Sequence, residues 1–355
     1  MINGVINIYK EAGYTSFDVV AKLRRILKIK KIGHTGTLDP DAVGVLPVCV
    51  GNATKLVDML TDRTKEYIAI MKLGVVTDTQ DMSGEVLAED YESAEQLSYE
   101  KVRAAVESFK GEIEQIPPMY SALKINGQKL CDLARQGIEV ERKSRPVTIY
   151  SIDVQPYDEE CDGLHNTQPR SERQSGLHNV YYLLKVECSK GTYIRTLIHD
   201  IGQKLGCGAA MEHLERTRVG KFRVEDAIKI AQIENMVKGT DESTAKDVLG
   251  DDVLKDRLGN VLTEVDIILD EYAALHVTAE GMKALDNGNK LYKNMIKEWP
   301  NDTVMSTCNE SAQAHDDIML TNGAVCRIYS YDNQFRALYR YDMREGALVV
   351  EKMFG

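Results

Sequence analysis

Apolar residues recur at helical spacing in two segments of the chain, residues 15–29 and residues 191–206. At the start of the first segment, Thr15 and Asp18 form the residue pair of an N-terminal capping box. The apolar stripe of this segment consists of Phe17, Val20, Leu23 and Leu27. The stripe of the second consists of Ile194, Leu197, Ile198, Ile201 and Leu205. Both segments therefore predict amphipathic helices, and a further helix is expected over residues 99–113.

Shorter segments that alternate apolar with polar residues, or that are apolar throughout, predict strands. They are residues 1–9, 65–74, 145–157 and 181–187. After about Tyr272 the chain changes to short β segments, and residues 324–342 predict a hairpin that turns at Asp332–Asn333. Helices mixed with strands, followed by a β-rich end, predict an α+β protein. We place a domain boundary between residues 1–269 and residues 270–355.

Composition is that of an ordinary globular protein, with 43% hydrophobic and 28% charged residues among 355. No run approaches the roughly 18 to 20 apolar residues that span a membrane. The first residues lack the pattern of a signal peptide. The seven cysteines are an odd number without a C-x-x-C pair, which favours reduced thiols over a disulfide framework. The expected location is therefore the cytoplasm.

The net charge of −11 argues against a nucleic-acid partner, but the charge is unevenly distributed. Residues 22–31 hold six cations and no acid. Such a stripe is typical either of a solvated helix face or of a local site for a polyanion, and charge alone favours the solvated face. In contrast, residues 158–179 are almost devoid of apolar residues and predict an exposed, mobile insertion.

Familiar motifs for nucleotide, metal and serine-hydrolase sites are absent, and the histidines are not spaced as metal ligands, so no metal or other cofactor is expected. The segment KIGHTGTLDPDAVGVLPV, residues 31–48, remains as a glycine-rich loop. Pro40 restricts the backbone of Asp39 to extended conformations, so the main chain that carries this carboxylate is rigid. An aspartate held in this way is able to act as a nucleophile or as a general base. Taken alone, however, an Asp-Pro turn without chemistry is the more common case.

Other candidate residues are equally open on local grounds. A single loop histidine such as His34 is usually a polar surface residue, and Tyr67 in an apolar strand is more often core than catalytic. Arg195 lies at the edge of an apolar helical stripe, where a structural ion pair is the default interpretation.

Several segments together resemble the TruB family, bacterial tRNA pseudouridine synthases that act on uridine 55 of the T-loop. The resemblance spans residues 3–224, apart from the insertion at 158–179. It is carried by GHTGTLDP, KEYIAIMKLGVVTDTQDMSG, PPMYSALKINGQKLCDLARQGIEV and KGTYIRTLIHDIGQKLG, in the family's order. The resemblance implies the pseudouridine synthase fold, a mixed, mainly antiparallel sheet with flanking helices and a central cleft. It also implies an RNA-gripping insertion over about 118–146 and a small PUA-like RNA-binding domain over 270–355.

The same resemblance implies roles for residues that match the family's motifs. Asp39 matches the catalytic aspartate, Tyr67 the tyrosine that stacks on the target base and helps to move a proton, and Arg195 the arginine that pairs with the carboxylate. Asp81 matches an aspartate that joins this network, and Leu214 a leucine that packs against the base.

Further residues are implied in RNA binding. His34 matches the histidine that enters the T-loop, and Lys10 matches a lysine that supports the site. Here the segment around Lys10 reads KEAGYTS, with Glu11 where the family has proline. Lys124 and Lys129 of the insertion are expected to contact phosphates.

The expected function is thus isomerisation of uridine 55 in tRNA by a monomer without cofactor, membrane or protein partner, together with assistance to tRNA folding. Two alternatives remain open at this point. One is a non-catalytic tRNA-binding or tRNA-folding protein, and the other is an enzyme that acts on a free nucleoside or another small anion.

Overall fold

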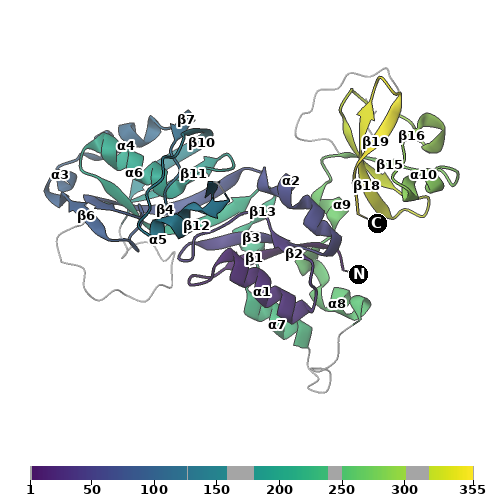
Figure 1. The fold of residues 1–355 in the computed structure, drawn as a ribbon, viewed down its shortest axis with the longest axis horizontal. Coiled ribbons are helices and arrows are strands. Elements are labelled where there is room, and N and C mark those ends of the chain that lie inside the picture. The colour runs from purple at the N-terminus through teal and green to yellow at the C-terminus, as the bar shows by residue number, and fades with distance from the viewer. Residues whose placement is uncertain (1, 126, 158–179, 239–249, 301–319, 355) are drawn as a thin grey trace.

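The computed structural model describes residues 2–125, 127–157, 180–238, 250–300 and 320–354 (Figure 1). The insertion predicted at 158–179 lies outside these residues. The described helices are α1 (Ser16–Leu27), α2 (Val57–Thr61), α3 (Tyr91–Glu95), α4 (Tyr99–Glu107), α5 (Leu130–Arg135), α6 (Ile194–Leu205), α7 (Ile230–Lys238), α8 (Asp251–Leu258), α9 (Val265–Ile268) and α10 (Met282–Asp286). None of these is long and apolar enough to cross a membrane.

One large sheet crosses the centre of the molecule (Figure 1). Its main strands, in spatial order, are β14 (Leu262–Thr263), β1 (Gly4–Lys10), β3 (Val43–Val50), β12 (Ala209–Val219), β4 (Lys65–Leu73), β11 (Tyr181–Cys188), β10 (Arg145–Pro156) and β7 (Gly111–Gln115). Two shorter strands, β2 (Ile32–His34) and β13 (Phe222–Arg223), pair with β3 and β12. Among these pairs β12 and β3 run parallel and the others antiparallel, so the predicted mixed, mainly antiparallel sheet is confirmed.

Both faces of the sheet are buried at the β1–β3 end. Because side chains alternate along a strand, Ile6 and Ile8 point to one face of β1 and Val5 to the other. Ile6 and Ile8 pack in a core with α1, α7 and α8, and Val5 packs in another with α2 and α9. Near the β11 end, α4 and α6 pack against the sheet in a third core. This sandwich makes the middle strands a rigid platform.

Helix α1 begins at the predicted capping box. The backbone N–H of Asp18 donates to the Thr15 hydroxyl, and the Thr15 N–H donates to the Asp18 carboxylate. The predicted apolar stripe needs one correction. Val19, Val20, Leu23 and Leu27 form the buried face, whereas Phe17 is 66% exposed. Phe17 occupies the second helical position, outside this buried face.

Two other expectations about elements were wrong in part. The helix expected over residues 99–113 ends at Glu107, and β7 begins at Gly111, whose φ of 107° is incompatible with a helix. The segment 31–48, expected to be a loop, contains β2 and most of β3, so His34 lies in a strand. Of its three glycines only Gly44 has a positive φ.

A second sheet lies apart at the C-terminal end, coloured yellow and green in Figure 1. Its strands, in spatial order, are β15 (Ala273–His276), β17 (Val325–Tyr329), β18 (Phe335–Asp342), β19 (Ala347–Met353) and β16 (Leu291–Tyr292). The predicted hairpin is thus β17–β18, with its turn at Asp332–Asn333. The chain changes sheets between β14 and β15, near the predicted boundary at residue 270. That boundary stays a prediction, since Leu338 and Phe354 share a core with Val5 and Leu56 of the first sheet.

Two short hairpins extend from the large sheet. They are β5 (Val75–Thr77) with β6 (Val86–Glu89), and β8 (Lys124–Ile125) with β9 (Gln128–Lys129). The first carries the Asp81 loop between its strands, and the second carries both lysines predicted to contact phosphates. Both hairpins are two-stranded sheets of their own, separate from the two larger sheets.

Candidate functional site

A cavity of about 300 Å³ brings together the four residues expected to surround the target base. Asp39 enters it from the loop between β2 and β3, Tyr67 from β4, Arg195 from the first turn of α6, and Leu214 from β12. Residues 121–123 and 189–194 complete the wall. Segments that are distant in the sequence thus meet at the centre of the large sheet, where β12 lies between β3 and β4.

Arg195 is the centre of a hydrogen-bond network. Its Nε lies 3.0 Å from Asp39 Oδ2, and its Nη2 donates to Asp39 Oδ1 at 3.1 Å. Its Nη1 donates to Asp81 Oδ2 at 3.2 Å and to the Thr79 carbonyl at 2.9 Å. Nη2 also donates to the Tyr120 carbonyl at 2.8 Å. All three nitrogens of this guanidinium, which is 5% exposed, are therefore committed, and Asp39 is clamped by a bidentate pair.

Asp81 is held in a tight loop behind the arginine. Its Oδ1 accepts from the hydroxyls of Thr79 and Ser83 at 2.7 and 2.5 Å. The preceding residue, Gln80, has a φ of 65°, which is uncommon for a residue other than glycine. Gln80 is fixed in this conformation because its side chain accepts from Thr196 on α6 and its carbonyl accepts from Met211 on β12. The loop therefore presents Asp81 to Arg195 in one orientation.

The ionisation of Asp39 reflects a balance of opposing effects. Its side chain is 36% exposed, yet its partial removal from water raises the pKa of the carboxyl above the usual range. Arg195 opposes the rise, and the negative charge of Asp81 adds to it. Asp39 is consequently more basic than a surface aspartate, as a group that accepts a proton requires, and it remains accessible from the cavity.

Lys10 lies beneath the Asp39 loop and is fully buried. Its ammonium donates to the carbonyls of Ala42, Pro40 and Glu11 at 2.5, 2.9 and 3.2 Å. Burial lowers the pKa of Lys10 to about 8, against a partly compensating attraction to Asp39. Three donors match three carbonyls, so this lysine holds the chain directly after Asp39, at Pro40 and Ala42, against the end of β1. Glu11 in place of proline leaves this contact intact.

His34 lies on β2, outside the cavity wall but on the segment that leads into it. Its Nδ1 accepts from the Gly36 N–H at 3.3 Å. Burial, followed by the positive charge of Arg216, lowers the pKa of His34. The ring is therefore a neutral imidazole with an apolar face.

Lys124 and Lys129 face each other across the β8–β9 pair and are exposed. Neither lines the cavity, which the same segment reaches through Ser121, Ala122 and Leu123. The segment is tied to the site at Tyr120, whose carbonyl binds Arg195 and whose hydroxyl donates to Asp78 at 3.1 Å. The two lysines thus lie on a hairpin that continues directly from the cavity-lining residues 121–123.

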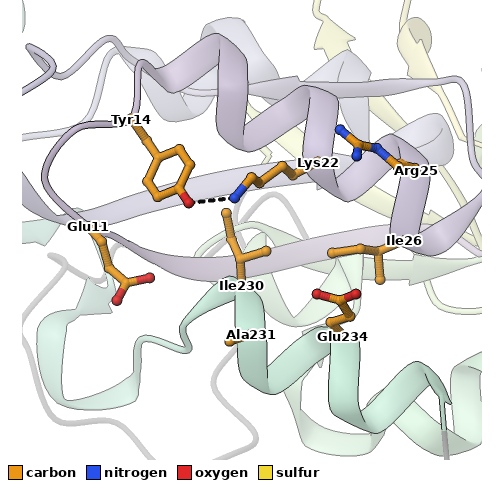
Figure 2. Close-up of a pocket in the computed structure, with 8 residues that line it drawn as sticks. All are labelled: Glu11, Tyr14, Lys22, Arg25, Ile26, Ile230, Ala231 and Glu234. Carbon is orange, nitrogen blue, oxygen red and sulfur yellow. Dashed lines mark hydrogen bonds between the residues drawn. The ribbon is translucent and has the colours of Figure 1, made fainter.

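The basic stripe of residues 22–31 is less free than its charge suggests. Figure 2 shows a second cavity, of about 250 Å³, in which Lys22 donates to the Tyr14 hydroxyl. Glu234 projects from the facing helix α7, and Glu11 lies below Tyr14 at the left of the view. Elsewhere in the stripe, Arg24 donates to the Ile32 carbonyl at 2.8 Å. Several of these cations therefore have partners within the protein, and we assign the cavity no role.

Sequence reasoning missed three residues that line the cavity, namely Lys65, Tyr193 and Arg216. Tyr193 is fixed by Gln115 of β7, which accepts from the Tyr193 N–H at 2.8 Å and donates to its carbonyl at 3.0 Å. Lys65 is buried and donates to the carbonyls of Thr61 and Arg63. Lys65 and Arg216 are charged residues of strands and Tyr193 directly precedes α6, and no local sequence pattern distinguished them as cavity residues. Within the described residues, no cluster of three or more His, Cys, Asp or Glu side chains is placed to hold a metal ion.

Comparison with known proteins places this fold and site in a class. Two solved structures align over 99% of this chain and 85% of theirs, a Cbf5-Nop10-Gar1 complex (26% identity, TM-score 0.64) and an H/ACA RNP bound to a substrate RNA containing 2′-deoxyuridine (25%, 0.62). The fold is that of the pseudouridine synthases, with a PUA-like β domain at its C-terminal end, as the sequence predicted.

The family follows from the sequence comparisons. Residues 24–194 match the TruB family pseudouridylate synthase N-terminal domain, and residues 195–270 match the tRNA pseudouridylate synthase B C-terminal domain. The tRNA pseudouridine synthase B of Lachnoclostridium phytofermentans is 44% identical, covering 99% of this chain and all of that protein. That of Clostridium tetani is 51% identical over 65% of this chain and 73% of that protein. The chain belongs to the TruB family, and its activity is that of a tRNA pseudouridine synthase, an isomerase.

Proposed function

We propose that this enzyme converts uridine 55 in the T-loop of tRNA to pseudouridine, with Asp39 as the catalytic carboxylate. The observation that carries the proposal is the bidentate pair between Arg195 and Asp39 at the edge of the cavity. A clamped carboxylate with a raised pKa suits nucleophilic attack as well as proton abstraction. The similarity to bacterial tRNA pseudouridine synthases supports the choice of tRNA as substrate.

The reaction breaks the bond between N1 of uracil and C1′ of ribose, turns the base, and joins C5 to C1′. The base at C5 loses a proton and N1 gains one, so the reaction is a balanced isomerisation. A uridine stacked within the T-loop has to be extruded first, which costs a few kcal/mol. Tyr67, which is 8% exposed, and Leu214 would flank the extruded base with a flat ring and an aliphatic side chain.

RNA binding would draw on residues around the cavity. The neutral ring of His34 suits insertion into the T-loop by stacking. Lys124 and Lys129 are exposed cations that suit contacts to phosphates, whose affinity weakens as salt increases. We propose that the C-terminal sheet adds a second contact to tRNA and that one chain in the cytoplasm suffices for activity.

The uridine that is modified tests this proposal. Pseudouridine in an unmodified full-length tRNA is mapped by carbodiimide labelling and reverse transcription, with a tRNA carrying C55 as the matched control. We expect a single stop at position 55, absent from the control RNA. Modification at another uridine would contradict the assignment of position 55, and the absence of any pseudouridine would contradict the catalytic proposal.

A further inference from the structure

Arg216 is a buried arginine to which the reaction described above gives no role. It lies on β12 and is 2% exposed. In the sheet it pairs with Gly44 of β3 on one side and with Tyr67 of β4 on the other. Residues in cross-strand register are neighbours, so Arg216 joins the strand that leaves the Asp39 loop to the strand that carries Tyr67.

The guanidinium of Arg216 contacts the Asp39 loop from below. Its Nε donates to the Val45 carbonyl at 2.7 Å, and its terminal nitrogens lie 3.5 Å from the carbonyls of Thr37 and Gly36. The main chain of Arg216 also lies close to this segment, because residue 44 is glycine. A Cβ there would lie 2.3 Å from the Arg216 carbonyl oxygen. The loop is therefore fitted to this arginine on both sides of Asp39.

Tyr67 is the second partner. Burial raises the pKa of the Tyr67 phenol, and the positive charge of Arg216 together with its hydrogen bond to the phenol oppose that rise. Arg216 thus lies opposite Tyr67 in the cross-strand register, influences the Tyr67 phenol electrostatically, and binds the main chain that flanks Asp39. Both groups line the cavity in which the base would react.

The charge of Arg216 has no neutralising partner nearby. Among the residues that the structure describes, no carboxylate forms an ion pair with it, whereas its neighbours Arg195 and Arg218 both have one. Burying an unpaired cation costs several kcal/mol, and an apolar side chain of similar size would fill the same volume more cheaply. Packing alone therefore does not account for an arginine at this position.

Resting on the proposed function, we propose that Arg216 is a positioning residue for the isomerisation, one that fixes the Tyr67 hydroxyl relative to the Asp39 carboxylate. It would act through Tyr67 and the 36–45 segment; although it lines the cavity, it is only 2% exposed and offers little surface to RNA. Misplacement of a reacting group by about 1 Å is able to lower a rate about 100-fold. RNA affinity, in contrast, depends on surfaces that Arg216 does not reach.

The test is a double-mutant cycle with Tyr67→Phe, which removes the hydroxyl and keeps the ring. The single-turnover rate constant of pseudouridine formation and the Kd of the same tRNA are measured for Arg216→Met, Tyr67→Phe and the double variant. We expect Arg216→Met to lower the rate constant by about 100-fold with Kd within about threefold. The double variant should be at least about tenfold faster than the product of the single effects predicts, because both changes disturb one contact.

Arg218→Met is the matched control, since Arg218 lies two residues further along β12 and forms a partly exposed ion pair with Glu187. Its rate constant should stay within about twofold of the wild type. If Arg216→Met does not fold, as judged by thermal unfolding, the cycle is run with Arg216→Lys. Lysine keeps the positive charge but loses the planar guanidinium that binds several acceptors at once. Additive effects in the cycle, or a change confined to Kd, would overturn the inference. An inactive wild type would overturn the proposed function itself, whereas an active wild type with additive variants overturns this inference alone.

Discussion

At the scale of single residues, the role of Arg195 depends on the partners that the fold places around it. Arg195 sits on an apolar helical stripe, where its sequence context predicts only a structural ion pair. In the fold it pairs with Asp39 and Asp81 and also holds the Tyr120 carbonyl. The GHTGTLDP and KGTYIRTL motifs indicated both ends of this contact. The geometry of the contact could not be predicted from the sequence, because residues 39 and 195 are far apart in the chain and only the folded sheet brings them together.

Asp81 offers a test of how the ionisation of Asp39 is set. Because the negative charge of Asp81 raises the pKa of Asp39, replacing Asp81 by asparagine should lower it. Activity that needs ionised Asp39 is lost as pH falls through this pKa. The acid limb of the single-turnover rate constant should therefore move to lower pH in Asp81→Asn, with a plateau lowered by about 10- to 100-fold as Arg195 loses a partner. Asp78→Asn, in the same loop, should leave the limb in place. A limb that moves to higher pH in Asp81→Asn would refute this account.

Lys10 makes a prediction about stability. Its pKa of about 8 in the folded protein lies below the ordinary 10.5, so between these pH values the unfolded chain binds more protons than the folded one. The free energy of unfolding contributed by Lys10 then rises with pH across that window and is constant below pH 8. Relative to Lys10→Met, the wild type should gain roughly 3 kcal/mol between pH 7.5 and pH 10.5 in urea unfolding. An unchanged difference between the two proteins would show that Lys10 is not desolvated.

At the scale of secondary structure elements, hydrophobic periodicity predicted helices correctly where one face of the helix is buried and the other is exposed. Helix α6 buries all five residues of its predicted stripe. Strand β12 was missed, although it is central to the sheet, because its sequence AAMEHLERTRV is rich in charge. Glu215, Arg216 and Thr217 are nevertheless buried there. Their partners lie on β1, β3 and β4, so no local pattern could have indicated this strand.

Gly44 tests the fit between β3 and β12. It has a φ of 102°, and a Cβ would collide with the main chain of Arg216. Gly44→Ala should therefore lower the free energy of unfolding by about 3 kcal/mol and also slow the reaction, because the Asp39 loop would shift. Gly206→Ala is the control, since Gly206 has a φ of 87° but open space at its Cβ position. It should cost only about 1 kcal/mol. Equal losses in the two variants would mean that strain, and not the close strand approach, dominates at Gly44.

At the scale of the whole molecule, the two sheets contact each other through one shared hydrophobic cluster, in addition to the cores that each has of its own. The predicted change to short β segments near residue 270 coincides with the change from the first sheet to the second. Sequence patterns did not reveal that Leu338 and Phe354 would pack on the first sheet. Main-chain contacts add to this packing, since Asn52 donates to the Phe354 carbonyl at 3.0 Å and Arg327 donates to the Asp266 carbonyl at 3.0 Å. The C-terminal sheet is thereby held in a defined position beside the large sheet.

Phe354→Ala should separate the contributions of the two sheets. Phe354 is 4% exposed and packs on Phe335, so its truncation should cost about 3 kcal/mol and loosen the C-terminal sheet. Because we propose that this sheet contacts tRNA outside the cavity, Kd should rise several-fold while the single-turnover rate constant at saturating tRNA stays unchanged. Met343→Ala, at an exposed position in the turn between β18 and β19, should alter neither. A lowered rate constant with unchanged Kd would contradict the division of roles.

The central claim is that Asp39 performs the chemistry on tRNA. Its most direct measurement is the single-turnover rate constant of pseudouridine formation on an unmodified tRNA, for the wild type, Asp39→Asn and Asp41→Asn. Asp41 is the matched control because it is an exposed aspartate on the other side of Pro40. We expect Asp39→Asn to lose about 10⁴-fold or more with tRNA affinity retained, and Asp41→Asn to stay within about threefold of the wild type. Activity that persists in Asp39→Asn would contradict the account.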